Sequence, residues 1–366
     1  MDKPTKAVHG GAFFGAIGES LRSLDRADQI ISADVLDAWY DPSPRVLSAI
    51  SRHLPFLIKT SPPTHGDGLR EVIADTRGLR PENILLGSGT SSLMFLAMPK
   101  LIGPEDRVLV LDPSYGEYVH IVDNVIGAEL IRFELPLPDF ELDESALIES
   151  AKEVQFVVLV NPNSPTGQAI PLGSIQRVVA ACPQTTFWID ETYIDFYSNE
   201  LGESASCELL VGQFSNLIVS KSMSKYYGLS GLRVGYLVAN AKLVSEWERF
   251  SPPWSVGLIG QLAAIEALSN PDYYVDQSRL TREFRDEMKA GLTEFGWHVV
   301  PSVTNYLMAQ VPDGGVQVLC DQLADQGVFV RNCDSLSPRF QDGWLRIAVK
   351  DRETNHRMLA AIRQAL

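Results

Sequence analysis

Short runs of apolar residues, each ending in a polar turn, recur through the first two thirds of the chain. They occupy residues 84–86, 108–111, 156–160, 187–189 and 217–219, with helical patterns between them. Uninterrupted apolar strands that alternate with helices are typical of a parallel sheet buried on both faces. The pattern therefore predicts an α/β fold with a mostly parallel central sheet and helices on both faces.

The pattern changes after about residue 250. An apolar helix, an amphipathic helix and several strand-like runs follow, and a final helix is expected at 353–366. We therefore predict an N-terminal segment, residues 1–45, that packs across two domains. The large domain is expected at residues 46–250, and a smaller C-terminal α+β domain at residues 251–366.

Composition narrows the range of partners. The chain has 366 residues and a formal net charge of −15. Such an acidic protein attracts neither nucleic acid nor an anionic membrane through its overall field, so we expect a small-molecule partner. No apolar run reaches the length of a membrane span, and the first residues lack the apolar core of a signal peptide. The four cysteines show no metal-ligand spacing, which predicts reduced thiols, no bound metal and a cytoplasmic location.

Polar clusters follow the predicted strands directly. The segments GSGTSS, DPSY, NPNSPTG, DETY and SKSMSK each begin where an apolar run ends. In parallel α/β sheets, ligands bind outside the carboxyl ends of the strands. The five clusters are therefore expected to meet at one site, and this convergence says more than any single cluster does.

The last of these clusters lies within SKSMSKYYGLSGLRVGY, residues 220–236. Ser222 and Ser224 offer hydroxyl groups, the glycines let backbone N–H groups approach a ligand, and Arg233 supplies a charged fork. This set suits a phosphate. Lys225 stands among them, where its amine is placed to form a Schiff base with an aldehyde. The alternative is a solvated surface loop that carries one lysine.

The register S-x-S-K-x-x-G-L-x-G-x-R-x-G-Y resembles the internal-aldimine motif of fold-type I pyridoxal-phosphate enzymes, the class I/II aminotransferase family. The resemblance covers most of the chain, and the other motifs occur in family order. It implies pyridoxal 5′-phosphate as the cofactor, linked to Lys225. Gly89, Thr90 and Ser91 of GSGTSS are then expected at the phosphate, where a helix N-terminus favours an anion. Tyr115 of DPSY is expected to stack on the pyridine ring.

The resemblance also implies the reacting groups. Asp190 of DETY is expected to pair with the pyridine nitrogen, so that the ring withdraws electrons from the substrate α-carbon. Tyr193 is expected to hydrogen-bond the phenolic oxygen of the cofactor. Lys225 is the expected general base for the α-proton. Arg346 of WLRIAV is expected to bind the substrate α-carboxylate. Each residue alone has an ordinary structural alternative.

Within the family, the chain resembles histidinol-phosphate aminotransferases and threonine-phosphate decarboxylases. The segments HGG at 9–11, PPWSVG, TNYLMAQV and VFVRNCDSL match the decarboxylases. This resemblance implies that His9 and Arg331 help to hold a distal phosphate of the substrate. A surface histidine and a solvated arginine are the alternatives.

Two departures affect contacts of the cofactor. Ser164 stands where the family has the asparagine that contacts the phenolic oxygen, and Asn163 is the residue that could partly replace it. Ser61 stands where relatives carry a tyrosine that reaches the cofactor of the partner subunit.

A third departure lies in LDAWYDPSP, residues 36–44, which replaces NENPYGPSP of relatives. Here Asp37, Trp39 and Tyr40 are expected to bring a carboxylate and two aromatic rings to the substrate. A carboxylate suits a cationic distal group better than a phosphate, although Asp37 could instead cap a turn. We interpret the departures as a retained cofactor chemistry with a changed substrate.

Three functions follow from this pattern. The first hypothesis is an aminotransferase that acts on an amino acid and a 2-oxo acid. The second is a decarboxylase or an elimination or cyclisation lyase that uses the same cofactor. The third is a regulatory pyridoxal-phosphate-binding domain without turnover, against which the intact Lys225 and Asp190 argue. The sequence does not show which substrate bond is broken, and the resemblance implies a homodimer with the site near its interface.

Overall fold

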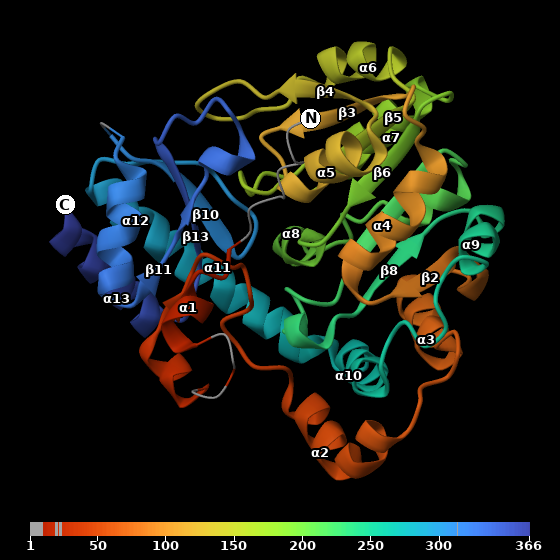
Figure 1. Cartoon of the computed structure of the whole chain (residues 1–366), viewed down its shortest axis with the longest axis horizontal. Coiled ribbons are helices and arrows are strands. Elements are labelled where there is room, and N and C mark those ends of the chain that lie inside the picture. Colours follow the sequence, from red (N-terminus) through yellow and green to blue (C-terminus); the bar gives the residue numbers. More distant parts are fainter. Residues whose placement is uncertain (1–9, 19–20, 22–23, 313) are drawn as a thin grey trace.

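A computed structural model describes residues 10–366 of the chain, apart from residues 19–20, 22–23 and 313 (Figure 1). A seven-stranded sheet with the order β2-β8-β7-β6-β5-β3-β4 lies at its centre. Strand β8 runs antiparallel to β2 and β7, and the other neighbours are parallel. The predicted mostly parallel sheet is therefore confirmed. Its strands are β2 (Ile84–Gly87), β3 (Arg107–Asp112), β4 (Glu129–Glu134), β5 (Phe156–Val160), β6 (Thr186–Asp190), β7 (Leu217–Ser222) and β8 (Gly235–Val238).

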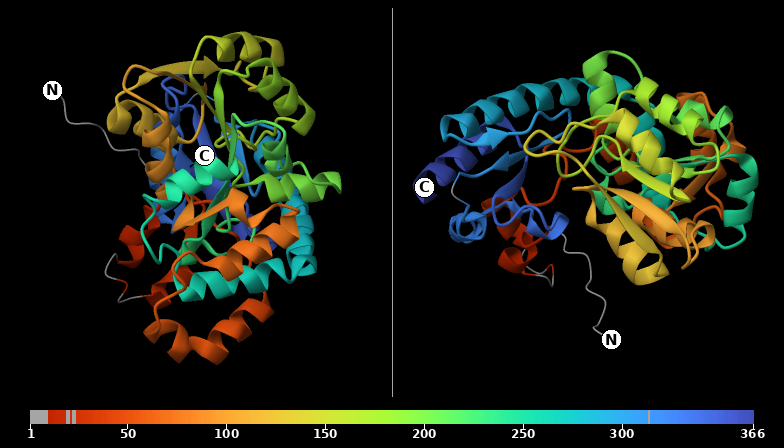
Figure 2. Two further views of the ribbon diagram at one scale, coloured as in Figure 1. Left: turned by 90° about the vertical axis from the view of Figure 1, so that its right-hand side faces the viewer. Right: turned by 90° about the horizontal axis from the view of Figure 1, so that it is seen from above.

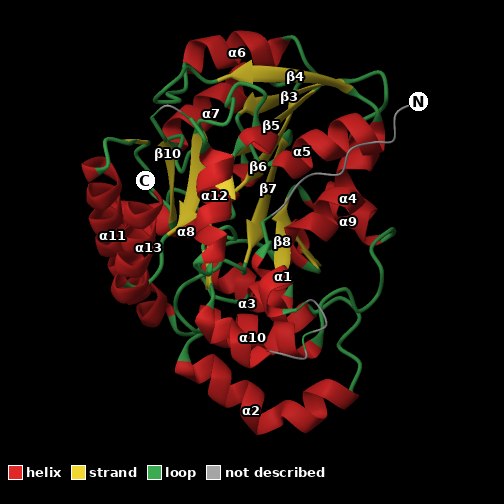
Figure 3. Ribbon diagram, turned by 60° about the vertical axis from the view of Figure 1, so that its left-hand side comes forward, coloured by secondary structure: helices red, strands yellow, loops and turns green. Residues whose placement is uncertain are grey.

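Helices cover both faces of this sheet (Figure 3). Val108 and Val110 of β3 share a core with α4 (Gly89–Leu101), α5 (Gly116–His120) and α9 (Ala241–Glu248). Leu109 and Leu111 point to the opposite face, whose core includes α3 (Asp67–Arg77), α6 (Glu144–Lys152), α7 (Leu172–Ala181) and α8 (Ile194–Leu201). Successive strand residues are therefore all buried, which explains why the runs are apolar without alternation.

The edge strand β4 was missed by the sequence analysis. It pairs only with β3 in the sheet order, and its side chains are half-buried or exposed, none of them fully buried. A strand that mixes charged and apolar residues in this way carries no continuous apolar signal.

A second, antiparallel sheet has the order β12-β13-β10-β9. It is formed by β9 (His298–Val299), β10 (Tyr306–Gln310), β12 (Arg331–Asn332) and β13 (Trp344–Ala348). The helices of this part of the chain are α10 (Leu258–Leu268), α11 (Pro271–Glu294), α12 (Val316–Asp325) and α13 (Arg352–Ala365). Helix α11 contacts α8 as well as α13, β9 and β10, so it spans from the helices of the central sheet to the second sheet (Figure 2).

Local signals place the helix ends. Helix α2 (Pro44–Lys59) begins after Ser43, whose hydroxyl accepts a hydrogen bond from the backbone N–H of Val46, and Pro44 occupies its first position. Helix α11 ends before Gly296, which has a φ of 79°. A glycine in the left-handed conformation ends a helix at little cost, which explains why the helix stops there.

The N-terminal part of the chain includes α1 (Phe13–Ile17) and β1 (Ile31–Ser32), which pairs with β11 (Val328–Phe329). The segment that follows β1 touches elements around both sheets. The Tyr40 hydroxyl donates to the carbonyl of Tyr226, and the Trp39 indole donates to Thr281 on α11. Helix α10, although it lies after residue 250, packs against α2 and α3. The domain limits at residues 45 and 250 stay predictions.

The four cysteines are free, with Cys320 half-buried and Cys182, Cys207 and Cys333 buried. Among the described residues, no helix combines the length and the apolar composition that crossing a bilayer requires.

Candidate active site

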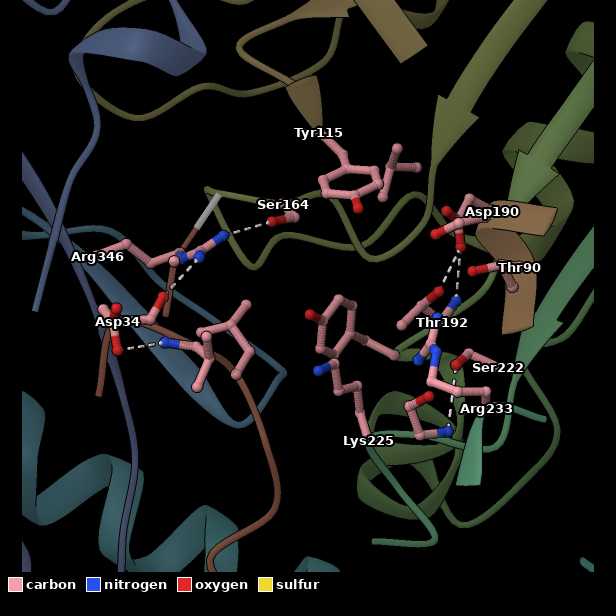
Figure 4. A pocket seen from close by; sticks show the side chains of 17 residues that line it. Asp34, Thr90, Tyr115, Ser164, Asp190, Thr192, Ser222, Lys225, Arg233 and Arg346 are labelled. Atoms are coloured by element: carbon pink, nitrogen blue, oxygen red, sulfur yellow. Dashed lines mark hydrogen bonds between the residues drawn. The ribbon is translucent and has the colours of Figure 1, made fainter. Parts of the chain in front are cut away.

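A cavity of about 210 Å³ lies where β2, β3, β5, β6 and β7 end. Side chains from the five predicted polar clusters line it, together with Arg346 from the second sheet (Figure 4). The structure therefore brings together eleven of the predicted site residues: Thr90, Ser91, Tyr115, Ser164, Asp190, Tyr193, Ser222, Ser224, Lys225, Arg233 and Arg346.

One end of the cavity is suited to a phosphate. Thr90 and Ser91 lie in the first turn of α4, where backbone N–H groups have no partner within the helix. Arg233 reaches the same place and lies against Gly89. Gly89 has a φ of 75°, and a Cβ at this position would lie 2.5 Å from Arg233 Nη2. Gly89 does not line the cavity itself, but its lack of a side chain makes room for the arginine.

Asp190 occupies the end of β6 and is 4% exposed. Its Oδ1 accepts hydrogen bonds from the Thr192 backbone N–H at 3.0 Å and from the Thr192 hydroxyl at 2.7 Å. Its Oδ2 accepts one from the Tyr118 hydroxyl at 2.7 Å. Burial raises the pKa of Asp190, although these donors and Lys221 oppose the shift. All three hydrogen-bond donors are neutral, so a cationic N–H group at this carboxylate would be stabilised strongly.

Two tyrosines bound the middle of the cavity. Tyr115 lies across the cavity from Lys225 (Figure 4), and burial raises its pKa to about 12, so the phenol is neutral. Tyr193 is buried beside Tyr306, with their ring centroids 5.1 Å apart in an edge-on arrangement. These rings provide flat apolar walls for a planar ligand.

Lys225 projects into the cavity from the loop after β7. Its Nζ lies 2.7 Å from Asp37 Oδ1, and the Ser230 hydroxyl donates to the same oxygen at 2.6 Å. Asp37 does not line the cavity, and the lysine amine is its partner. The structure therefore places Asp37 beside the reactive amine, whereas the sequence analysis expected it at the substrate.

Arg346 comes from β13 and is 9% exposed. Its Nη1 donates to the Ser164 hydroxyl at 3.0 Å, and its Nη2 donates to the backbone carbonyl of Asp34 at 3.3 Å. Its Nε is buried without a hydrogen-bond partner. Among the described residues, the guanidinium forms no ion pair. A buried cation with only neutral acceptors at the wall of a cavity is well suited to a carboxylate ligand.

Ser164 and Asn163 have different roles in the turn after β5. Ser164 faces the cavity, where its hydroxyl holds Arg346. The Asn163 side chain does not line the cavity, because its amide donates to the carbonyl of Pro113 at 3.0 Å and to the hydroxyl of Thr166 at 3.2 Å. Ser164 is thus the residue of this turn that the structure brings to the ligand space.

The other predicted substrate residues lie outside the cavity lining. Trp39 packs edge-on against Tyr40 and Phe284, and its indole donates to Thr281. Tyr40 is buried and donates to the carbonyl of Tyr226. The structure therefore does not bring these rings to the ligand, because core contacts hold both of them.

Arg331, Ser61 and His9 complete the predicted set. Arg331 pairs with Arg346 across β12 and β13 and donates to Ser335 at 2.7 Å. Burial and the neighbouring Arg346 lower the pKa of Arg331. Ser61 is exposed between α2 and α3. His9 lies outside the described residues.

Some lining residues were not predicted: Gly10, Asp34, Val35, Leu36, Val160 and Thr192. Thr192 had a sequence signal, since an aspartate side chain often accepts a hydrogen bond from the backbone N–H two residues further on. Asp34 had none. Its carboxylate is 2% exposed and accepts from the backbone N–H groups of Gly11 and Ala12, so it ties the N-terminal segment to the cavity.

A buried ion cluster lies next to the site. Lys221 Nζ lies 3.4 Å from Glu191, 3.6 Å from Glu208 and 3.7 Å from Asp195. Arg77 binds both carboxylate oxygens of Asp195, at 2.9 and 3.1 Å. Burial raises the pKa of Asp195, but Arg77 and Lys221 outweigh this and lower it overall. The cluster supports the strand ends that carry Asp190 and Lys225.

The cavity fits pyridoxal 5′-phosphate. Its cationic end at Arg233 suits the phosphate, its buried carboxylate at Asp190 suits a pyridinium N–H group, and Tyr115 offers a ring face. Lys225 supplies an amine between these groups. A cavity with a phosphate end, a buried acid and a lysine defines the class of pyridoxal-phosphate enzymes.

The sequence comparisons identify the family. The model of the family "Aminotransferase class I and II" matches residues 34–362. Histidinol-phosphate aminotransferase 2 of Carboxydothermus hydrogenoformans is 30% identical over 357 residues and covers 95% of both chains. Histidinol-phosphate aminotransferase 2 of Archaeoglobus fulgidus is 31% identical over 330 residues, which are 89% of this chain and 90% of the relative. The chain belongs to the class I and II aminotransferase family and is a pyridoxal-phosphate-dependent transferase.

Solved structures confirm the fold. Histidinol-phosphate aminotransferase from Sinorhizobium meliloti, solved with pyridoxal 5′-phosphate, has a TM-score of 0.85 at 20% identity and covers 99% of this chain and 95% of its own. L-threonine-O-3-phosphate decarboxylase from Porphyromonas gingivalis has a TM-score of 0.75 at 23% identity, with 89% and 98% covered. At these identities the likeness defines the fold alone.

Proposed function

We propose that the chain transfers the amino group of an α-amino acid to a 2-oxo acid, with Lys225 as the residue that binds the cofactor covalently. The observation that carries this proposal is the arrangement of Lys225, Asp190, Arg233 and Arg346 around one cavity. The curated relatives, which are named as aminotransferases, support the same reaction.

Each residue has a defined task. The phosphate of the cofactor is bound by Arg233, Ser222, Ser224, Thr90 and Ser91. Asp190 holds a proton on the pyridine nitrogen. When bound, pyridoxal phosphate withdraws electrons from the substrate α-carbon. Tyr115 and Tyr193 orient the ring.

Two residues act on the substrate. Lys225 is the general base that removes the proton from the substrate α-carbon. Its amine then holds this proton until the proton is returned. Arg346 binds the α-carboxylate through its guanidinium, while Ser164 fixes the direction of that side chain. The neutral partners of Arg346 leave its charge available for the substrate.

A lyase reaction is the second candidate. The observation that favours it is the altered segment at residues 36–44, which contributes Leu36 to the cavity wall and directs Asp37 at Lys225. This segment departs from the pattern of the aminotransferases, and the bond that breaks depends on how the substrate is held there. Carbon dioxide or ammonia is the product that would distinguish this reaction.

A single-turnover experiment tests the proposal. The purified holoenzyme is mixed with pools of amino acids, and the products are followed by mass and by the spectrum of the cofactor. We expect a 2-oxo acid and aminated cofactor in equal amounts, and no turnover by Lys225→Ala. Carbon dioxide or ammonia without a 2-oxo acid would instead establish the lyase.

We also propose a cytoplasmic homodimer. Helix α2 exposes Leu47, Leu54, Phe56 and Ile58, each at least 39% accessible, and a second copy of the chain is the partner that we expect to cover them. Light scattering on a gel-filtration peak measures the mass directly, and a monomer at micromolar concentration would refute this assignment.

A further inference from the structure

The segment that departs from the family delivers a carboxylate to the reactive amine. Asp37 Oδ1 lies 2.7 Å from Lys225 Nζ and 2.6 Å from the hydroxyl of Ser230. That hydroxyl also lies 3.1 Å from the carbonyl of Ser224. The Lys225 amine therefore forms an ion pair with a carboxylate from the altered segment at residues 36–44.

Contacts other than the ion pair hold Asp37 in place. The carbonyl of Leu36 accepts a hydrogen bond from the Asn305 side chain at 3.0 Å. The indole of Trp39 donates to Thr281 at 2.9 Å. Because Leu36 and Trp39, one on each side of Asp37 along the chain, are anchored to other elements, the backbone at Asp37 is held close to the lysine.

The same segment also holds the loop of the lysine. The hydroxyl of Tyr40 donates to the carbonyl of Tyr226 at 2.6 Å, one residue after Lys225. The segment thus binds this loop at two points, the backbone through Tyr40 and the amine through Asp37. This explains why Tyr40 is buried instead of facing a substrate.

The charges around Asp37 favour its ionised form. Burial raises its pKa, but the ammonium of Lys225, the hydroxyl of Ser230 and the more distant Lys350 together lower it below the usual value. Burial lowers the pKa of Lys350, which follows β13, although Asp37 and Asp34 oppose this shift. Asp37 is therefore an anion that holds the Lys225 amine in an ion pair.

We propose that Asp37 is a positioning residue that receives the Lys225 amine whenever this amine is not bonded to the cofactor, and that it thereby slows covalent capture of the cofactor aldehyde. The inference rests on the proposed role of Lys225. In the capture step, the ammonium first loses a proton to solvent. The neutral nitrogen then attacks the aldehyde carbon, a carbon–nitrogen double bond forms, and the aldehyde oxygen leaves as water.

The test measures how fast the full-length chain captures the cofactor. The cofactor is removed with hydroxylamine, saturating pyridoxal 5′-phosphate is added, and the absorbance of the Lys225 linkage is followed between pH 6 and 9. The amine has to leave this ion pair before it reacts, and a pair whose carboxylate side chain is 44% exposed holds it only weakly. We therefore expect Asp37→Asn to capture the cofactor about two- to fivefold faster than the wild type.

Two control variants separate charge from structure. Asp37→Glu keeps the carboxylate and should behave like the wild type. Asp41→Asn removes the same charge from an exposed position four residues away and should also match the wild type. Ser230→Ala removes the hydroxyl that helps to hold Asp37 and that also contacts the Ser224 carbonyl, so a smaller acceleration is expected, and it provides a measurement if Asp37→Asn fails to fold.

The outcomes are distinct. If Asp37→Asn and Asp41→Asn capture the cofactor at the wild-type rate over the whole pH range, the proposal is wrong. Slower capture by Asp37→Asn at every pH would also overturn it, because the carboxylate would then assist the step. If the wild type forms no linkage that Lys225→Ala abolishes, the assignment of Lys225 fails instead.

Discussion

Replacing Gly89 by alanine should weaken cofactor binding through Arg233. The φ of 75° places this residue in the left-handed region, where a side chain costs about 1–2 kcal/mol. The new Cβ would lie 2.5 Å from Arg233 Nη2 and 3.0 Å from Cζ, so the guanidinium has to move. A displaced guanidinium loses a charge-assisted hydrogen bond to the phosphate, worth about 1.5–3 kcal/mol. We therefore expect the Kd for pyridoxal 5′-phosphate to rise about 10- to 150-fold.

Equilibrium dialysis against pyridoxal 5′-phosphate measures this change, and urea unfolding of the cofactor-free chain measures the backbone cost separately. Gly231→Ala is the matched control, because a Cβ at Gly231 would meet nothing within 4 Å and its φ is not positive. The control should bind with a Kd within about twofold of the wild type. If Gly89→Ala binds the cofactor as tightly as Gly231→Ala, the placement of Arg233 at the phosphate is refuted.

Two further predictions concern Arg346 and the buried ion cluster. Ser164→Ala removes the acceptor of Arg346, so steady-state kinetics should show a KM for the amino acid raised roughly fivefold, with an unchanged cofactor Kd; a lower kcat at constant KM would contradict this role. Asp195→Asn should destabilise the fold by about 3–5 kcal/mol at pH 7, because Arg77 loses its buried partner. The pKa of Asp195 is lowered in the fold, so its stabilisation is present above the unfolded value and is lost as the pH falls. The difference between Asp195→Asn and the wild type in urea unfolding should therefore shrink below about pH 4, and a constant difference would refute the assignment.

The cofactor half of the site could be predicted because its residues are fixed by strand ends. A strand that stops at Asp190 or Ser222 directs the next few residues to the same edge of the sheet as its parallel neighbours. Sequence order and apolar runs were therefore sufficient to group the clusters that contain Thr90, Tyr115 and Lys225, whereas the roles of Thr90 and Tyr115 came from the family resemblance.

The substrate half could not be predicted in the same way. The segment around Asp37 belongs to no long strand or helix, so no period of two or 3.6 residues fixes the direction of its side chains. Trp39 and Tyr40 point to Thr281 and Tyr226, which are nearly 200 residues or more away in the chain. Whether Ser164 or Asn163 faces the ligand likewise depends on contacts that a sequence motif does not contain.

This division has a consequence for how the substrate can change. Asp190 and Lys225 are carried by the central sheet. Arg346 comes from the second sheet, and Asp34 comes from the segment after β1, the strand that pairs with β11. Substitutions at Asp34, Val35 or Leu36, which line the cavity, therefore alter the space around a substrate without shifting the strand ends that hold the cofactor. Asp37 and Tyr40 are different, because they hold the Lys225 side chain and the backbone of its loop. A change at Asp37 should therefore alter the availability of the amine itself.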